Sequence, residues 1–156
     1  MSKPKFVYVT YIDSTPEKVW RALTDGEVTK EYWVRHNNVS DWKVGSAWKH
    51  QDYDDPTKVD IAGTVVESAP PHRLVVTWAR PADVDNPGKT SRVTYDIEQF
   101  RDVVRLTLTH EDLEPDSEML RGITAGWPVV LSSLKTLLET GTAMAMTRHR
   151  WERPPE

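Results

Sequence analysis

Five segments in the middle of the chain alternate apolar and polar residues with a period of two, as β-strands do when one face is buried and the other solvated. In 91–100, for example, Val93, Tyr95 and Ile97 share one face. Clusters of Gly, Pro, Asn and Asp separate the segments. The β-branched and aromatic stretch KFVYVTYI adds a strand near the N-terminus. The pattern predicts six strands, at 5–12, 46–53, 59–68, 73–80, 91–100 and 103–111.

Near the C-terminus, apolar residues recur at spacings of three and four, which predicts one long amphipathic helix. Asp116 or Ser117 can cap its start, and Gly141 supplies the left-handed residue that commonly ends a helix. Two shorter helices are expected after the first strand, in STPEKVWRALTD and EVTKEYWV. In the first of these, Ser14 and Glu17 form a possible capping box.

The long helix contains Gly126-Trp127-Pro128, a sequence that disfavours a regular helix. A proline removes one helical hydrogen bond and crowds the preceding turn, a defect of about 3 kcal/mol in a helix interior. The helix therefore either kinks or starts late. Trp127 either packs in the core or walls a cavity between the helix and the sheet, and the sequence leaves both possibilities open.

The order of elements is strand, two short helices, five strands and one long helix, which indicates an α+β fold with the helix covering one face of an antiparallel sheet. The 156 residues suffice for one domain, which we expect to span 1–141. Residues 142–156 show no sustained pattern and are expected to be a partly disordered tail. Met144, Met146 and Trp151 could dock that tail on the surface.

Composition excludes several classes of function. The net charge of −4, with both signs interspersed, gives no basic face for a nucleic-acid partner. No segment approaches 18 apolar residues and the N-terminus lacks the apolar stretch of a signal peptide, so no membrane association is expected. The chain has no cysteine, which fits a reducing compartment, and we expect a cytoplasmic location.

The chain carries few motifs typical of enzymes. No two histidines have helical i, i+4 spacing, and no glycine-rich phosphate loop or nucleophile elbow occurs. We therefore expect neither a metal nor another cofactor. His50, Tyr95 or His110 could act as a general acid or base if one of them meets a substrate. The sequence favours a binding protein over an enzyme.

Four stretches together resemble a known family: STPEKVWRALTDGEVTKEYW, VVESAPPHRLVVTW, SRVTYDIEQFRDVVRLTLTHEDL and GWPVVLSSLKTLLETG. They resemble the stand-alone bacterial members of the family named for the activator of the heat-shock-protein-90 ATPase, within the START-like helix-grip superfamily, also called SRPBCC. The resemblance implies a curved six-stranded sheet around a long C-terminal helix, with a small apolar molecule bound between them. A chaperone-linked interaction module and a cyclase-type enzyme are the alternative roles. No sequence feature supports a chaperone partner directly.

Inward-facing positions of the strands and the long helix would line such a cavity, and its ligand would be aromatic or lipid-like. His50, Tyr95 and His110 could provide polar contacts to it. Each candidate could instead fill the core, the commoner role of buried tryptophan and histidine. The candidate ligand-binding residues are Trp33, Trp48, His50, Trp78, Tyr95, Leu106, Leu108, His110, Trp127, Val130, Leu131 and Leu134.

Overall fold

A computed structural model of the chain describes residues 3–149. Seven strands form one sheet in the order β1-β7-β6-β5-β4-β3-β2, and all neighbours are antiparallel. The strands are β1 (Phe6–Ile12), β2 (His36–Val39), β3 (Ala47–Asp52), β4 (Val59–Ala69), β5 (Arg73–Trp78), β6 (Ser91–Phe100) and β7 (Val103–Glu111). The helices are α1 (Pro16–Thr24), α2 (Gly26–Tyr32), α3 (Glu118–Thr140) and α4 (Ala145–Arg148), with short 3-10 turns η1 (Pro81–Asp83) and η2 (Pro87–Lys89).

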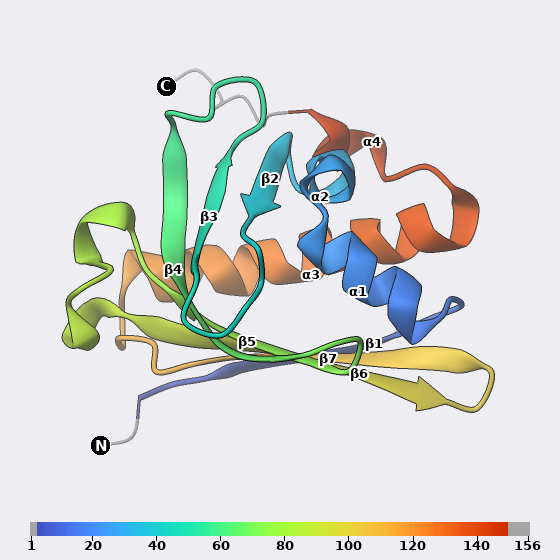
Figure 1. Cartoon of the computed structure of the whole chain (residues 1–156), viewed down its shortest axis with the longest axis horizontal. Helices are drawn as coiled ribbons and strands as arrows, with labels where there is room; N and C mark the ends of the chain where they lie inside the picture. Colours follow the sequence, from blue (N-terminus) through green and yellow to red (C-terminus); the bar gives the residue numbers. More distant parts are fainter. Residues whose placement is uncertain (1–2, 150–156) are drawn as a thin grey trace.

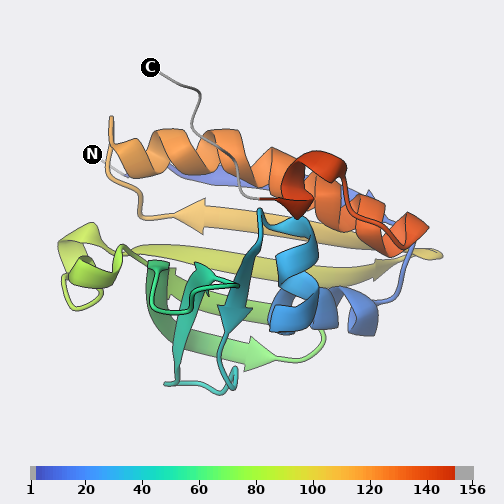
Figure 2. The ribbon, with the colours of Figure 1, turned by 90° about the horizontal axis from the view of Figure 1, so that it is seen from above.

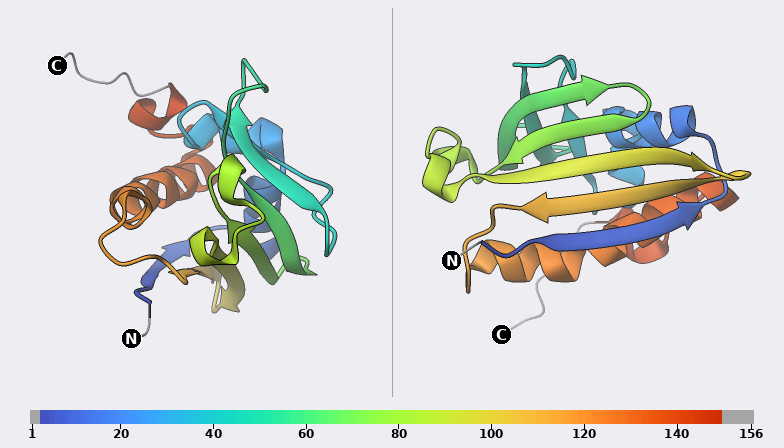
Figure 3. Two further views of the ribbon diagram at one scale, coloured as in Figure 1. Left: turned by 90° about the vertical axis from the view of Figure 1, so that its left-hand side faces the viewer. Right: turned by 90° about the horizontal axis from the view of Figure 1, so that it is seen from below.

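The sheet curls around α3. In Figure 1, β5, β6, β7 and β1 form the lower layer, and β4, β3 and β2 rise at one side of α3. The left view of Figure 3 shows the same curl nearly end-on. From above, α3 runs along β1 and β7, while α1 and α2 lie beside its C-terminal half (Figure 2). This α+β arrangement is the helix-grip fold that the resemblance implies.

The main core lies between the concave face of the sheet and α3. Many of its side chains come from the inward-facing positions that the period-two and period-3.6 patterns predict, and the eight named next are at most 4% exposed. They include Val76, Tyr95, Ile97, Leu106, Leu108, Val130, Leu131 and Leu134. Among residues 3–149, no helix is both long and apolar enough to cross a membrane.

The six predicted strands are all present, and β2 is a seventh that the pattern does not predict. The long helix begins as expected, with Ser117 Oγ accepting a hydrogen bond from Leu120 N at 3.0 Å, and it ends at Gly141 with φ of 90°. The first helix cap is one residue away from the prediction. Thr15, and not Ser14, accepts the hydrogen bond from the backbone of α1.

Pro128 lies inside α3 and does not delay its start. The helix begins at Glu118, so a late start, one of the two expected responses to the proline, is wrong. Pro128 cannot donate to the Thr124 carbonyl. Thr124 is exposed, and water can satisfy its carbonyl instead. The helix therefore tolerates the proline, because the carbonyl that loses its hydrogen bond lies on the solvent-exposed side.

Residues 142–149 pack against the domain. The buried Thr147 contacts the hydroxyl of Ser133 on α3, and its carbonyl accepts a hydrogen bond from Val34 N at 2.8 Å. Met144 N donates to the same Ser133 hydroxyl at 3.0 Å. The packed chain thus continues past Gly141 and contacts the segment after α2. The remainder of the expected tail, with Trp151, lies outside the described residues.

Candidate functional site

Trp78, at the end of β5, is the centre of an aromatic cluster inside the curl of the sheet. Its ring centroid lies 5.4 Å from that of Trp48, 6.5 Å from that of Trp33 and 5.4 Å from that of Trp127. The rings of Trp33 and Trp127 meet edge-on at 5.3 Å. All four tryptophans are buried. Tilted and edge-on ring contacts of this kind are favourable, so the cluster ties α3 and the segment after α2 to the sheet.

His110, on β7, is held by hydrogen bonds on both sides of its ring. The indole Nε1–H of Trp127 donates to His110 Nδ1 at 3.0 Å. Because an indole N–H can only donate, Nδ1 carries the lone pair and the ring proton is on Nε2. That Nε2–H donates to Ser91 Oγ at 2.8 Å, and the Ser91 hydroxyl donates to the Trp78 carbonyl oxygen at 3.0 Å. This chain of hydrogen bonds joins α3 to β7, β6 and β5 and fixes the tautomer of His110.

Burial lowers the pKa of His110 to about 3, so the ring is neutral at physiological pH. A second proton would have to occupy Nδ1, where Trp127 already donates. Both ring nitrogens are therefore engaged in the fold. In this arrangement His110 anchors α3 and has no free lone pair for acid–base chemistry.

His50, on β3, lies beside the tryptophan cluster. Its ring centroid is 5.0 Å from that of Trp33, and it stacks at 5.0 Å on the ring of His36 from β2. His50 Nδ1 donates a hydrogen bond to Asn38 Oδ1 at 2.7 Å. Burial, and to a lesser extent the nearby His36, lowers the pKa of His50 to about 3. The ring is therefore neutral, with its lone pair on Nε2.

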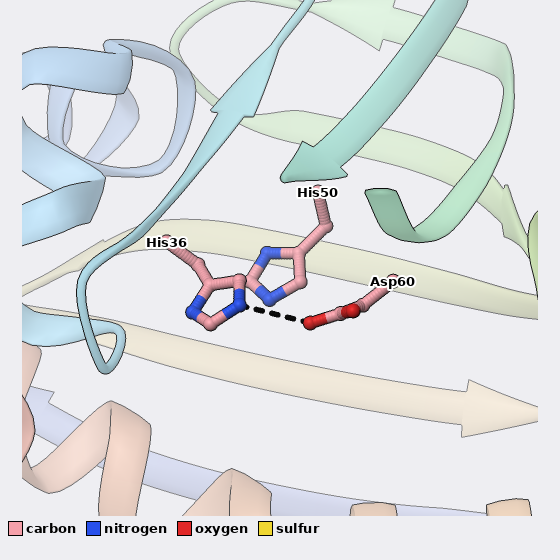
Figure 4. A group of neighbouring side chains, drawn as sticks. All are labelled: His36, His50 and Asp60. Carbon is pink, nitrogen blue, oxygen red and sulfur yellow. Dashed lines mark ion pairs between the residues drawn. The ribbon is translucent and has the colours of Figure 1, made fainter. Parts of the chain in front are cut away.

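Asp60 of β4 points at these two stacked histidines (Figure 4). His36 Nε2 lies 2.8 Å from Asp60 Oδ2. His36, His50 and Asp60 each offer one possible ligand atom, and the three atoms lie within 4.8 Å of one another. The sequence pattern does not indicate this group, because His36 lies on β2, a strand that the pattern does not predict.

Two adjoining hollows open along the N-terminal half of α3, and we call them together the α3 groove. The larger has a volume of about 300 Å³ and lies against the ends of β4 and β5, where its lining includes Asp60, Ile61 and Trp78. The smaller has a volume of about 120 Å³ and is lined by Trp33, Trp78, Gly122, Ile123, Gly126 and Trp127. The two share the lining residues Trp78, Gly122 and Ile123, so they lie next to each other.

Gly122 and Gly126 form the helix side of the α3 groove. A Cβ atom at either position would have no contact within 4 Å outside the neighbouring helix backbone. Close packing therefore does not require glycine there. Glycine in a helix interior costs roughly 1 kcal/mol relative to alanine. The two glycines keep the groove open and lower the stability of α3.

The indole N–H of Trp78 is buried and has no hydrogen-bond acceptor among residues 3–149. Trp48 and Trp127 differ in this respect, because their Nε1 atoms donate to the Thr77 carbonyl oxygen and to His110 at 2.8 and 3.0 Å. An unpaired buried donor costs about 1–3 kcal/mol. Since Trp78 lines both hollows, this unpaired donor belongs to a residue that borders the α3 groove.

The structure divides the candidate ligand-binding residues into three groups. Trp33, Trp78 and Trp127 border the α3 groove. Trp48, His50, Tyr95 and His110 lie behind these rings and contact them. Burial also raises the pKa of Tyr95, which keeps its hydroxyl protonated. The core between helix and sheet contains Leu106, Leu108, Val130, Leu131 and Leu134.

Sequence reasoning does not place Met119 or Gly122 at the site, although both line the groove. The available signal is the pair of glycines four residues apart, Gly122 and Gly126, on the otherwise apolar side of a long helix. Two glycines at i and i+4 lie one turn apart on the same face. Their spacing could have indicated a strip of the helix surface where no side chain covers the backbone.

Comparison with known proteins identifies the family of the chain. The sequence profile of the family described as Activator of Hsp90 ATPase homolog 1-like protein matches residues 13–139, most of the chain. The chain belongs to this family. The resemblance found in the sequence is thereby confirmed. No curated protein matches the chain.

Solved structures of low sequence identity share the fold. The Aha1 dimer from Colwellia psychrerythraea has a TM-score of 0.71 and 21% identity, over 88% of this chain and 98% of that chain. An HSP90 activator from Plasmodium falciparum has a TM-score of 0.71 and 22% identity, over 86% and 95%. CalU16 from Micromonospora echinospora has a TM-score of 0.72 and 19% identity, over 97% and 77%. At these identities the likeness establishes the fold alone.

Proposed function

We propose that this family member binds a small apolar molecule, aromatic or lipid-like, in the α3 groove, and that it does so in the cytoplasm. The observation that carries the proposal is the buried, unpaired indole N–H of Trp78. A ligand that lies against Trp33, Trp78 and Trp127 would cover apolar ring surface. If it carries one oxygen or nitrogen acceptor, a small turn of the Trp78 ring would let it pair the buried donor as well.

The composition of the groove supports this class of ligand. Ligand sites are commonly apolar hollows of about 300–1,000 Å³ with a few polar groups that fix orientation. The larger hollow, at about 300 Å³, reaches that range; its apolar wall includes Ile61, Trp78 and Ile123, and Asp60, Arg80 and Glu118 are its charged groups. The flat rings favour a planar ligand that can stack or lie edge-on.

A thermal-shift screen against aromatic, sterol-like, acyl and polyketide-like compounds tests the proposal. A ligand at 100 times its dissociation constant stabilises the native state by about 2.7 kcal/mol. For a chain of this length that corresponds to a rise in Tm of about 5–10 °C. Absence of any saturable shift across these classes would contradict binding in the groove.

Two pairs of variants locate the binding site. Gly126→Leu fills the smaller hollow and should abolish the shift, whereas Ala125→Leu adds the same side chain at an exposed neighbouring position and should preserve it. Trp78→Phe keeps an apolar ring but removes the donor, so affinity should fall about 3- to 10-fold. Trp48→Phe removes a donor already paired within the fold and should leave affinity unchanged. Equal affinities of Gly126→Leu and Ala125→Leu would place the ligand elsewhere, and equal affinities of the two tryptophan variants would show that the ligand does not use the Trp78 donor.

A chaperone-linked role is a second candidate, favoured by an exposed apolar row on the edge strand β1. Val7, Val9 and Tyr11 point away from the core and are 49%, 46% and 45% exposed, and the Tyr11 ring lies 5.4 Å from that of Phe100. Exposed apolar rows of this kind mark interaction surfaces. The structural likeness to an HSP90 activator from Plasmodium falciparum suggests a chaperone of that class as the partner.

Stimulation of the ATPase of a purified HSP90-type chaperone tests this second role. Val9→Lys should reduce the stimulation, because it places a charge in the middle of the apolar row. Val44→Lys, at a valine that is 66% exposed between β2 and β3, is the matched control and should have no effect. If the wild-type protein gives no stimulation, or both variants lower it equally, the β1 row is not the docking surface.

A further inference from the structure

We propose that His36, His50 and Asp60 form a binding site for one divalent transition-metal ion, with Zn²⁺ as the probe. Two imidazole nitrogens and one carboxylate oxygen are a donor set that suits Zn²⁺ and related ions, and a three-residue set leaves a coordination position for water. The three possible ligand atoms already lie within 4.8 Å of one another. The proposal does not depend on the ligand of the α3 groove.

Both histidines are oriented as metal ligands commonly are. Metal-bound histidines usually donate from the second ring nitrogen to a carbonyl or carboxylate, which fixes the tautomer. His36 Nδ1 lies 2.8 Å from the Val34 carbonyl oxygen, which can only accept, so Nδ1 carries a proton. His50 Nδ1 donates to Asn38 Oδ1 at 2.7 Å. The two Nε2 atoms are left to face the space beside Asp60 (Figure 4).

The short contact between His36 and Asp60 is an ion pair when His36 is protonated, and a metal ion can take the place of that proton. His36 Nε2 and Asp60 Oδ2 lie only 2.8 Å apart, and His36 Nδ1 already donates to the Val34 carbonyl oxygen. Two lone pairs repel at that distance unless a proton or a metal ion lies between them. His50 Nε2 adds a nitrogen lone pair to the same space, because the ring proton is on Nδ1, which donates to Asn38. A divalent ion satisfies all three groups at once.

A β-bulge explains how Asp60 reaches the histidines. In the pairing of β3 with β4, His50 is opposite Ile61 and Gln51 is opposite Val59, so Asp60 is the extra residue. Bulges redirect side chains and bend the strand locally. The Asp60 side chain is 61% exposed, which gives an ion a route to the buried His50. Arg80, which also lines the groove near Asp60, has its charge offset by Glu118 at 3.0 Å.

The site needs a contraction and a tilt of one histidine ring to hold an ion. In a tetrahedral zinc site, bonds of 2.0–2.1 Å place ligand atoms about 3.3 Å apart. The present separations are at most 4.8 Å, and the exposed Asp60 carboxylate can rotate to close the difference. The rings of His36 and His50 are stacked 13° from parallel, and a nitrogen lone pair lies in the plane of its ring, so one ring must also tilt before both Nε2 atoms face the same ion.

Isothermal titration of the tag-free full chain with Zn²⁺ tests the site. The wild type should bind one ion per chain. Asp60→Asn removes the charged ligand at an exposed position, so the fold should persist while affinity falls at least about tenfold. Asp85→Asn, at an exposed aspartate outside the groove, is the matched control and should bind as the wild type does. No saturable binding by the wild type, or equal binding by the two variants, would overturn the proposal.

Nitrogen-15 NMR of the histidine rings gives a second readout. Zn²⁺ should shift the Nε2 signals of His36 and His50 and leave their Nδ1–H signals in place, because those protons are held by Val34 and Asn38. Shifts confined to the exposed His72 and His149 would show a surface ion instead and would refute the site.

Discussion

Acidification from pH 8 to pH 5 should destabilise the protein through its buried histidine anchor, His110. Burial lowers the pKa of His110 to about 3, below its ordinary value of 6.5. The unfolded chain therefore takes up a proton first as the pH falls, and stability decreases wherever the unfolded state binds more protons. The contribution of His110 is complete above pH 6.5 and is lost progressively as the pH falls from 6.5 toward 3.

The magnitude follows from these two values. At pH 5 an unfolded histidine of pKa 6.5 is almost fully protonated, whereas folded His110 is not, so the free energy of unfolding falls by about 2 kcal/mol. His50, whose pKa is also lowered to about 3, should add a similar loss. Carboxylates with lowered pKa, such as Glu139, lose their contribution at still lower pH, below about 4.5. The wild type should therefore lose about 4 kcal/mol between pH 8 and pH 5.

Urea denaturation at pH 8, 7, 6, 5.5 and 5, in the presence of a chelator, measures this loss. His110→Gln cannot titrate, so its free energy of unfolding should fall by about 2 kcal/mol less than that of the wild type over this range. The comparison uses the change with pH and not the absolute stability, which the substitution will also alter.

His72→Gln, at an exposed histidine, is the matched control and should retain the full wild-type change. If His110→Gln and the wild type lose the same free energy between pH 8 and pH 5, His110 is not a buried neutral anchor. The chain of hydrogen bonds from Trp127 through His110 to Ser91 would then be wrong.

Three further substitutions test the packing, each by urea denaturation. Gly63→Ala would place a Cβ atom 2.0 Å from the Thr77 carbonyl oxygen, so we expect a loss of about 1–3 kcal/mol or more, and unchanged stability would contradict that close approach. Gly126→Ala should raise the free energy of unfolding by about 1 kcal/mol, and a decrease would show that the α3 backbone needs glycine there. Trp127→Ala should cost about 3–5 kcal/mol, because it removes a buried ring and the donor to His110; a loss below about 1 kcal/mol would place Trp127 outside the core.

Most strands could be predicted from the sequence because alternation of apolar and polar residues reports burial directly. The predicted 91–100 and 103–111 coincide with β6 and β7. β2 could not be predicted, since its four residues, HNNV, are mostly polar and show no alternation. Its strand conformation comes from pairing with β3, which lies later in the chain.

The candidate site could be predicted only in part, for a related reason. Strand and helix periodicity indicates that Trp78 and Trp127 face inward, but not whether space remains beside them. That space depends on ring orientations and on the bare helix backbone at Gly122 and Gly126. The approach of Asp60 to the two histidines depends on one bulge, which no local pattern reveals.

The short helix α4 after the long helix has a consequence for truncation and proteolysis. Val34 and Arg35 have positive φ angles of 52° and 61°, a conformation that is unfavourable, above all for a β-branched residue, and that persists only when its surroundings enforce it. The Thr147 carbonyl holds this bend through Val34 N. Trp33, a wall of the α3 groove, precedes the bend, and His36 follows it. A chain cut at Gly141, or a protease that removes α4, would release the bend and disturb the groove and the histidine pair together.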